Sequence, residues 1–528
     1  MTRFILFAAL FVLTGLSAGP CRTEEVAPVG TWQSVEEPLV IPDGAALSPG
    51  KGDFSLSIWA SSDPESDQLP GDLVSQYDQV TRRGFQLTLK SNPGATTNQA
   101  NWRHLQFGID DNRATGWIDC GRPGNALLAF ALAVHEGALY AGTCEPGKGE
   151  RGRVYRYDGP GKWIDCGAPD ASNSVMALAE YEGALYAGTG RYRVAGSALA
   201  ESENLSPGGR LFRYEGGTRW IDCGQLPDTE AVGGLVVFRG KLYASSLYKP
   251  AGFFRYEGGD RWTSLPVPTG PDATTGEIGP KRVEALSVYE GHLYASSYDG
   301  GHVYRFDGEG WTDCGLVGDN TQTYSFTQYE GGLHVGTWPS GRVYRFEDLK
   351  RWTDAGRLGG EKEVMGMLVH NGRFLAGSLP LAEVYSYEGG TDWKLTGRLD
   401  HTPDVTYRRA WTMAEHDGQA FCSTLPSGKV FSYAAGRQVQ WGRSLPGGWQ
   451  HLAAVKSADR LSLYVNGEVV AAMAIPATDA YDLTSDAPLR IGSGTTGPFN
   501  ASLRDVRLYH RALAPDTIRT LAGDKPDR

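Results

Sequence analysis

Charged and aromatic side chains gather in variable segments of this chain, next to short apolar runs. Aromatic rings stack on sugar rings, and arginines hold carboxylates or sulfates through paired hydrogen bonds. These segments therefore indicate a sugar-binding site, although packing and solvated loop charge account more readily for any single residue. We select five ligand-binding candidates: Tyr324, Trp338, Arg282, Arg408 and His302.

Proton abstraction is a second chemistry that the residues allow. Tyr407, Arg408 and His401 lie close together in one segment, and a Tyr or His beside an Arg can remove the proton next to a uronate carboxylate, as polysaccharide lyases do. Glu361 and Glu363 could instead form the carboxylate pair of a glycosidase. Neither pattern is specific, because charged loop residues are common, so the sequence leaves open whether the chain is an enzyme.

Several motifs that would identify an enzyme or a metal site are absent from the sequence. It has no GxSxG, HExxH or phosphate-binding glycine loop in the required context, and no CxxC or Cys/His pattern with zinc spacing. We therefore expect no metal from these motifs. Four of the seven cysteines recur at one position of a repeat, which favours small buried residues over disulfides: Cys120, Cys166, Cys223 and Cys314.

The composition limits the classes of partner. The 528 residues carry a net charge of −11, which argues against nucleic acid or an anionic membrane as the main partner. The 70 glycines, 25 tyrosines and 14 tryptophans favour short strands joined by tight turns. We therefore expect an all-β protein.

The N-terminus resembles an export signal. Arg3 precedes an apolar run at 4–13, small residues follow, and the run is too short for a permanent membrane span. We expect a signal peptide at 1–20 and a periplasmic, secreted or cell-surface protein. Cys21 raises the alternative of a lipid anchor, which Pro20 disfavours. No later stretch is long and apolar enough to cross a membrane.

A repeat organises the middle of the chain. Trp-Ile-Asp-Cys-Gly occurs at Trp117, Trp163 and Trp220, and five degenerate copies follow. Each unit also carries phrases such as EGALYAGT and VYRYDG. The tyrosine position of the first of these phrases recurs at residues 140, 186, 243, 294, 334, 375 and 421, close to the spacing of propeller blades.

Each unit predicts four strands with two largely apolar faces, which a ring of such units can bury on both sides. We therefore predict a seven-bladed β-propeller over 113–445. Eight tryptophan strands exist for seven blades. Trp117 is expected to close the ring by completing the last blade, and Trp441 either competes for that place or lies in the exit segment. The variable loops lie on one face of the ring, which we take as the working face.

The flanking segments alternate apolar and polar residues, as half-buried strands do. SLSIWA before the propeller, and GWQHLAAV, LYVNG and DVRLYHRAL after it, resemble a laminin-G-like, concanavalin A-type jelly roll. The resemblance implies one β-sandwich in two pieces, 30–112 and 446–524, interrupted by roughly 330 residues, far more than an ordinary loop. The propeller is thus expected to be inserted into a loop of the jelly roll.

The resemblance has implications for ligands. Relatives of such domains often bind glycans, sometimes through calcium, and Asp110, Asp111 and Asn500 are of the right type for it. No other cofactor is expected. Three functions remain open: an exported carbohydrate-binding or surface-adhesion protein with a glycan or polysaccharide partner, which we prefer; a secreted carbohydrate-active enzyme, most plausibly a polysaccharide lyase; and a scaffold for a protein partner.

Overall fold

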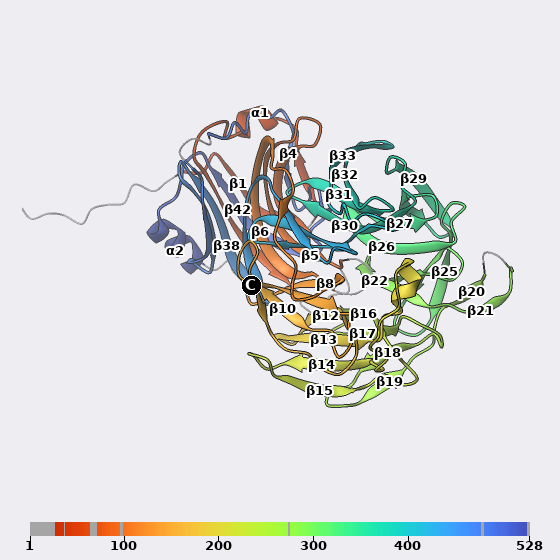
Figure 1. Cartoon of the computed structure of the whole chain (residues 1–528). Coiled ribbons are helices and arrows are strands. Elements are labelled where there is room, and N and C mark those ends of the chain that lie inside the picture. Colours follow the sequence, from red (N-terminus) through yellow and green to blue (C-terminus); the bar gives the residue numbers. More distant parts are fainter. Residues whose placement is uncertain are drawn as a thin grey trace, which may run out of the picture.

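A computed structural model describes residues 27–35, 37–63, 71–94, 99–272, 275–476 and 480–524. The predicted signal peptide at 1–20 and Cys21 lie outside these residues. Figure 1 shows two bodies, a β-sandwich built from both ends of the chain and a β-propeller built from its middle. The predicted all-β class, a jelly roll with an inserted propeller, is confirmed. Among the described residues, no helix has the length and apolar character needed to cross a membrane.

The sandwich consists of two six-stranded sheets. One has the order β1 (Gly30–Val35), β42 (Ser502–Tyr509), β3 (Phe54–Ser62), β38 (Gly448–Ser457), β39 (Arg460–Val465) and β40 (Glu468–Ala474). The other has the order β2 (Leu39–Ile41), β41 (Leu489–Ile491), β4 (Asp72–Asp78), β5 (Arg83–Asn92), β6 (Asn101–Ala114) and β37 (Ala435–Ser444). The short helices α1 (Gly44–Leu47) and α2 (Pro515–Gly523) flank the sheets.

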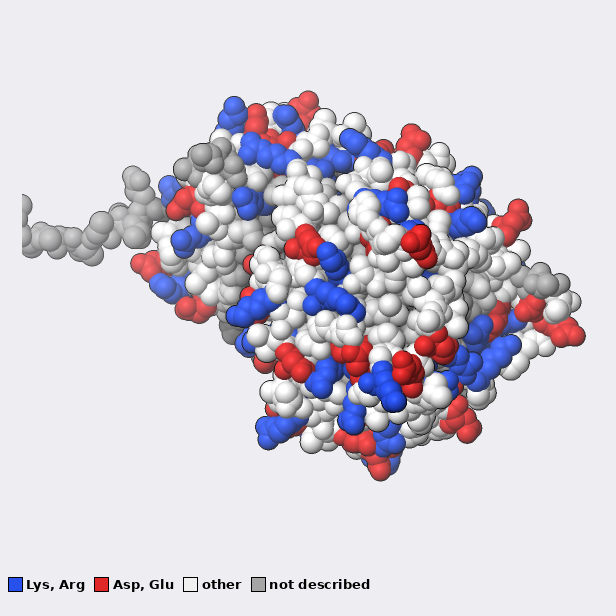
Figure 2. Space-filling view, in the orientation of Figure 1, with Lys and Arg blue, Asp and Glu red and all other residues white. Residues whose placement is uncertain are grey.

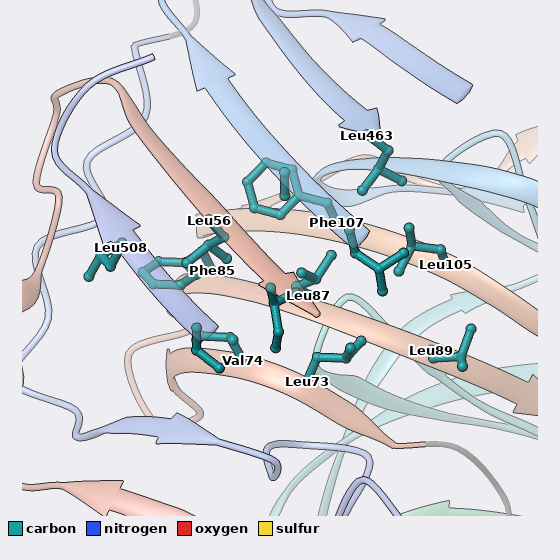
Figure 3. Close-up of a cluster of buried hydrophobic side chains, with 14 of the residues drawn as sticks. Leu56, Leu73, Val74, Phe85, Leu87, Leu89, Leu105, Phe107, Leu463 and Leu508 are labelled. Carbon is teal, nitrogen blue, oxygen red and sulfur yellow. The ribbon is translucent and has the colours of Figure 1, made fainter. Parts of the chain in front are cut away.

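The core of the sandwich comes from alternate residues of the facing strands. Leu56 of β3 and Leu508 of β42 meet Phe85 and Leu87 of β5 and Phe107 of β6, all essentially inaccessible to solvent (Figure 3). Period-two alternation places these residues on the inner face of each sheet. The two pieces of sequence therefore form one hydrophobic core.

The propeller leaves the sandwich after β6 and returns at β37, and these strands pair with each other in antiparallel fashion. Trp441 lies opposite Leu105 in this pairing, so the last tryptophan strand belongs to the sandwich. The boundary predicted at residue 445 was therefore about ten residues late. The alternating pattern of Ala435–Ser444 fits either body, and only its pairing with β6 distinguishes them.

The propeller has seven blades of four antiparallel strands each. Blade one consists of β8 (Leu128–His135), β9 (Ala138–Cys144), β10 (Val154–Tyr157) and β11 (Trp163–Asp165), and blade two of β12 (Ser174–Tyr181), β13 (Ala184–Gly190), β14 (Arg210–Tyr214) and β15 (Trp220–Gln225). Blade three consists of β16 (Val232–Phe238), β17 (Lys241–Ser246), β18 (Phe253–Tyr256) and β19 (Trp262–Ser264), and blade four of β22 (Val283–Tyr289), β23 (His292–Ser297), β24 (His302–Phe306) and β25 (Trp311–Leu316). A hairpin of β20 (Thr269–Pro271) and β21 (Ile278–Pro280) precedes blade four.

The remaining blades complete the ring. Blade five consists of β26 (Gln322–Tyr329), β27 (Gly332–Trp338), β28 (Arg342–Asp348) and β29 (Arg351–Arg357), and blade six of β30 (Glu363–His370), β31 (Arg373–Leu379), β32 (Glu383–Gly389) and β33 (Asp392–Arg398). Blade seven consists of β34 (Arg409–His416), β35 (Gln419–Leu425), β36 (Val430–Tyr433) and β7 (Ile118–Asp119). The strand β7 comes from the start of the propeller and pairs with β36, as predicted for the Trp117 segment. The first and last parts of the insert are thereby held together.

The repeated Trp-x-Asp-Cys-Gly phrase is explained by contacts between blades. The indole Nε1 of Trp220 donates to the Cys166 carbonyl of the preceding blade at 2.8 Å, and Trp163 bonds Cys120 in the same way at 3.0 Å. Within the phrase, Asp165 accepts a hydrogen bond from the Gly167 backbone N–H, and this glycine has a φ of +90°. The six described cysteines are buried and free.

The sandwich docks on the propeller face that carries the short glycine turns. The backbone N–H of Gly137 donates to Gly442, and those of Glu330 and Gly331 donate to Thr495 and Thr496. The variable loops lie on the opposite face, because strands one and two are joined on the docked side and strands two and three on the other. Docking therefore covers one face and leaves the loop face open.

A buried ionic network lies in this junction. Glu415 of blade seven accepts from Lys90 of β5 at 2.7 Å, from Gln106 of β6 at 2.9 Å and from His370 of blade six at 2.8 Å. Burial alone would raise the pKa of Glu415, but Lys90 and His370 lower it to about 2. The carboxylate is therefore charged and satisfied at the centre of the contact.

We expect Lys90→Met to destabilise the protein by about 3–5 kcal/mol, because it leaves the buried Glu415 charge without its cation. Urea denaturation measures the loss. Lys429→Met is the matched control, since the Lys429–Asp119 pair is nearly half exposed and should contribute no more than about 1 kcal/mol. Equal effects of the two substitutions would contradict a structural role for the network.

Candidate functional site

The innermost strand of every blade contains a β-bulge at an equivalent position. The pairing register shifts between Val175 and Ala177 in blade two, between Val283 and Leu286 in blade four, and at the corresponding places in the other blades. A bulge re-aims the side chain of its extra residue. The first residues of the seven bulges together form a set that we call the bulge ring: Phe130, Met176, Gly233, Glu284, Tyr324, Met365 and Trp411.

The bulge ring converges on the centre of the propeller. Five of its members, Phe130, Met176, Tyr324, Met365 and Trp411, belong to one buried cluster although they come from five blades. The rings of Phe130 and Trp411 meet edge to face at 4.9 Å. The central channel is therefore closed at this level by packed side chains.

A cavity of about 600 Å³ opens above this level, on the loop face. Tyr324, Met365 and Trp411 of the bulge ring form part of its floor. Its walls come from the segments next to the ring and are rich in aromatic rings and arginines: Tyr192, Arg193, Ala195, Gly196, Ser197, Glu201, Leu247, Tyr248, Arg282, Tyr298, Gln322, Trp338, Glu363, Tyr407 and Arg409. We call this cavity the loop-face pocket.

The long loop of blade two forms one wall of the pocket. It follows β13 and contains the 3₁₀ helix η1 (Val194–Ser197). The Ser197 hydroxyl bonds Tyr192 within the loop at 2.5 Å and accepts from Arg409 of blade seven at 2.9 Å. The Arg193 backbone N–H donates to the Tyr248 hydroxyl of blade three at 2.9 Å. This loop is therefore tied to the blades on both sides of the pocket.

Each arginine of the pocket has a carboxylate partner. Arg282 donates through Nε and Nη2 to Asp299 at 2.9 and 2.8 Å. Arg409 donates to Glu363 at 3.0 Å, and this pair is almost fully buried. Arg193 donates to Glu230 at 2.7 Å. The cationic charge that these side chains bring to the pocket is therefore compensated by the protein itself.

Glu284 of the bulge ring differs from these carboxylates. It is 1% exposed, and its Oε2 atom has no hydrogen-bond partner in the part of the chain that the structure describes. Burial raises the pKa of Glu284 to about 8, against the lowering effects of Tyr298 and Arg282. The side chain also interacts electrostatically with Glu363 and Arg409 of blades six and seven, which fits a place at the channel centre.

The structure brings together part of the predicted site. Of the ligand-binding candidates, Tyr324, Trp338 and Arg282 line the loop-face pocket, and Tyr407 lines it as well. Trp338 and Tyr407 meet edge to face at 6.4 Å. Glu363 lines the pocket, whereas Glu361 is engaged with Ser378 and the Leu381 backbone N–H, so these two do not act as a pair.

The other candidates lie outside the pocket. His302 bonds Asp313 at 2.9 Å between β24 and β25. Arg408 donates to the Thr402 carbonyl at 2.6 Å, and His401 is exposed to solvent. Of Tyr407, Arg408 and His401, only Tyr407 borders the pocket, and a catalytic role for these three residues stays a prediction.

Most pocket residues were not selected from the sequence, among them Tyr192, Tyr248, Tyr298 and Met365. The repeats in the sequence contained a pattern that points to two of them. Tyr298 stands directly after the LYASS phrase of its blade, at the position that Trp338 occupies after LHVGT in the next. Met365 occupies the same bulge position as Tyr324. Alignment of repeat positions would have found them, whereas selection by residue type did not.

The residues proposed for calcium in the sandwich make other contacts. Asp110 is buried and accepts from Arg373 at 2.8 Å, and Asp111 is paired with Arg113 at 2.9 Å. Within the described residues, no group of three or more His, Cys, Asp or Glu side chains is arranged to hold a metal ion. Calcium binding in the sandwich stays a prediction.

Comparison with known families agrees with the sandwich. Residues 405–519 match the family described as the Concanavalin A-like lectin/glucanases superfamily. The chain carries a laminin-G-like, concanavalin A-like domain. The match begins before β34, so it includes strands of the last propeller blade as well as the second part of the sandwich. No curated protein matches the chain.

Solved structures resemble the chain only distantly. A virginiamycin B lyase from Staphylococcus aureus has 8% identity and a TM-score of 0.44, covering 61% of this chain and 99% of its own. The extracellular domain of a putative hybrid two-component system from B. thetaiotaomicron has 14% identity and a TM-score of 0.42, covering 60% and 39%. The β-propeller domain of Cps50 (Swd1) from Myceliophteria thermophila has 12% identity and a TM-score of 0.40, covering 60% and 98%.

We expect the contribution of Glu284 to the stability of the protein to fall as the pH rises from about 4.5 to 8. The folded protein holds this proton up to a pKa of about 8, whereas the unfolded chain releases it near the ordinary pKa of 4.5. Glu284 therefore contributes a loss of at most about 1.4 kcal/mol per pH unit in this window. Glu284→Gln removes the titration.

Urea denaturation of both proteins at pH 5, 6, 7 and 8 checks this expectation. All other titrating groups are shared, so the difference between the two curves isolates Glu284. The variant should gain stability over the natural protein as the pH rises. Parallel curves would show that Glu284 is ionised in the folded state throughout.

Proposed function

We propose that the protein is an exported carbohydrate-binding or surface-adhesion protein, and that its propeller binds a glycan in the loop-face pocket. The observation that carries this proposal is the lining of the pocket. Tyr248, Tyr298, Trp338 and Tyr407 come from different segments, are only partly buried and border one cavity of about 600 Å³. Partly exposed aromatic rings around polar groups suit the apolar faces and hydroxyls of sugars.

The position of the pocket supports this use. The sandwich covers the opposite face of the propeller, so the pocket opens away from the junction. Lys, Arg, Asp and Glu side chains are interspersed over the surface seen in Figure 2, with no continuous basic area in that view. The export signal expected at 1–20 would bring the protein to a compartment where polysaccharides occur.

The sandwich is a second glycan-binding element in this proposal. Its fold is that of the concanavalin A-like lectin and glucanase superfamily, which supports carbohydrate contact without assigning a site. A lyase remains an alternative, but only Tyr407 of its three candidate residues borders the pocket. A scaffold for a protein partner would use the same loop face.

We expect Trp338→Ala to weaken glycan binding by roughly 10- to 100-fold, because truncating the ring removes about 1.5–3 kcal/mol of apolar contact. The natural protein is first screened on a glycan array, and the ligands found are titrated by calorimetry. His302→Ala is the control, since His302 lies outside the pocket. Unchanged binding by Trp338→Ala would place the ligand elsewhere, for example on the sandwich.

A further inference from the structure

Glu284 stands out when the seven equivalent positions of the bulge ring are compared. Five of the others are large apolar or aromatic residues, and the sixth is Gly233, which has no side chain. Tyr324, Met365 and Trp411 of this ring lie in the floor of the loop-face pocket. By its bulge position Glu284 places a carboxyl group at the same level, directly behind the residues that line the floor rather than among them.

This carboxyl group is unfavourable for the fold on its own. It is almost completely buried, and its Oε2 atom lacks a hydrogen-bond partner among the described residues. An unpaired polar atom in such a place destabilises a protein, whereas the apolar residues of the other blades do not. Tyr298 bonds the carboxyl group, but the packing supplies nothing for Oε2, and a ligand that bonds this atom would.

We propose that Glu284 is the recognition residue of the loop-face pocket and that it bonds a hydroxyl group of an uncharged sugar. This inference rests on the proposed function and specifies its ligand. The hydroxyl reaches the floor of the pocket beside Tyr324 and bonds the Oε2 atom that the protein leaves unpaired. Aromatic walls hold the sugar ring, and Glu284 selects its orientation.

The charges around the pocket favour an uncharged ligand over a uronate or a sulfated sugar. Arg282, Arg409 and Arg193 are already bonded by Asp299, Glu363 and Glu230. Arg282 and Arg193 also stack on Tyr298 and Tyr248, with the guanidinium carbon 5.1 and 4.3 Å from the ring centres. An anionic group would have to compete with these carboxylates and would approach the Glu201 carboxylate as well.

The floor of the pocket itself holds a second unsatisfied atom. The indole Nε1 of Trp411 is buried and has no hydrogen-bond partner within the described ranges. A sugar carries several hydroxyl groups, each of which donates and accepts. One ligand can therefore satisfy the Glu284 carboxyl and the Trp411 donor, which an alkyl or aromatic ligand cannot do.

The test uses the full chain with cello-, xylo- and manno-oligosaccharides as uncharged probes and oligogalacturonates as anionic probes, titrated by calorimetry at pH 7. Glu284→Met copies the residue that blades two and six have at this position. We expect it to melt at a higher temperature than the natural protein and to bind the uncharged probe at least tenfold more weakly. Glu284→Gln, which keeps a donor and an acceptor, should bind within about threefold of the natural protein.

The outcomes separate the two proposals. If Trp338→Ala loses binding but Glu284→Met keeps it, the pocket binds glycans and the role of Glu284 is rejected. If the natural protein prefers oligogalacturonates, the uncharged ligand is rejected. If it binds no glycan at all, or binds only a protein, both the proposed function and this inference fail. The melting temperature shows that a loss of binding by Glu284→Met is not a loss of folding.

Discussion

The contact around Glu415 is the constraint on which the arrangement of the whole molecule depends. A carboxylate with no solvent exposure is stable only if cations and donors from both bodies reach it, and Lys90, Gln106 and His370 do so. This requirement fixes one sheet of the sandwich against the glycine turns of the propeller. The loop face, with its pocket, is thereby the propeller surface that remains accessible.

The bulge in each innermost strand is what converts a repeated scaffold into a site. Without it, the register of the strand would keep its side chains between neighbouring blades, where the cores of the propeller lie. With it, one residue per blade is turned toward the axis. Because seven bulges occur at one level, six side chains and the backbone of Gly233 come together there, and a change of residue type in one blade alters the centre without altering the ring.

The sequence was sufficient for the architecture because the repeat and the strand alternation are local patterns. The closure by β7 followed from the surplus tryptophan strand, and the split sandwich followed from motifs such as GWQHLAAV. The residues of the site were harder to predict from the sequence. His401 and Tyr407 are similar in type and near in sequence, yet only Tyr407 faces the pocket, since that depends on the path of a loop. Glu284 was one charged residue among many until the bulge register was known.

The residues two positions before the bulge ring differ between the two halves of the propeller. In blades one to three these are Leu128, Ser174 and Ala231, whereas blades four to seven have Arg282, Gln322, Glu363 and Arg409. The long loop of blade two covers the first half, brings Arg193 and Glu201 to the pocket, and reaches Arg409 through Ser197. A ligand therefore meets hydrogen-bonding groups from both halves, next to the aromatic rings of the walls. A sugar ring, with an apolar face and polar edges, suits such a mixed lining.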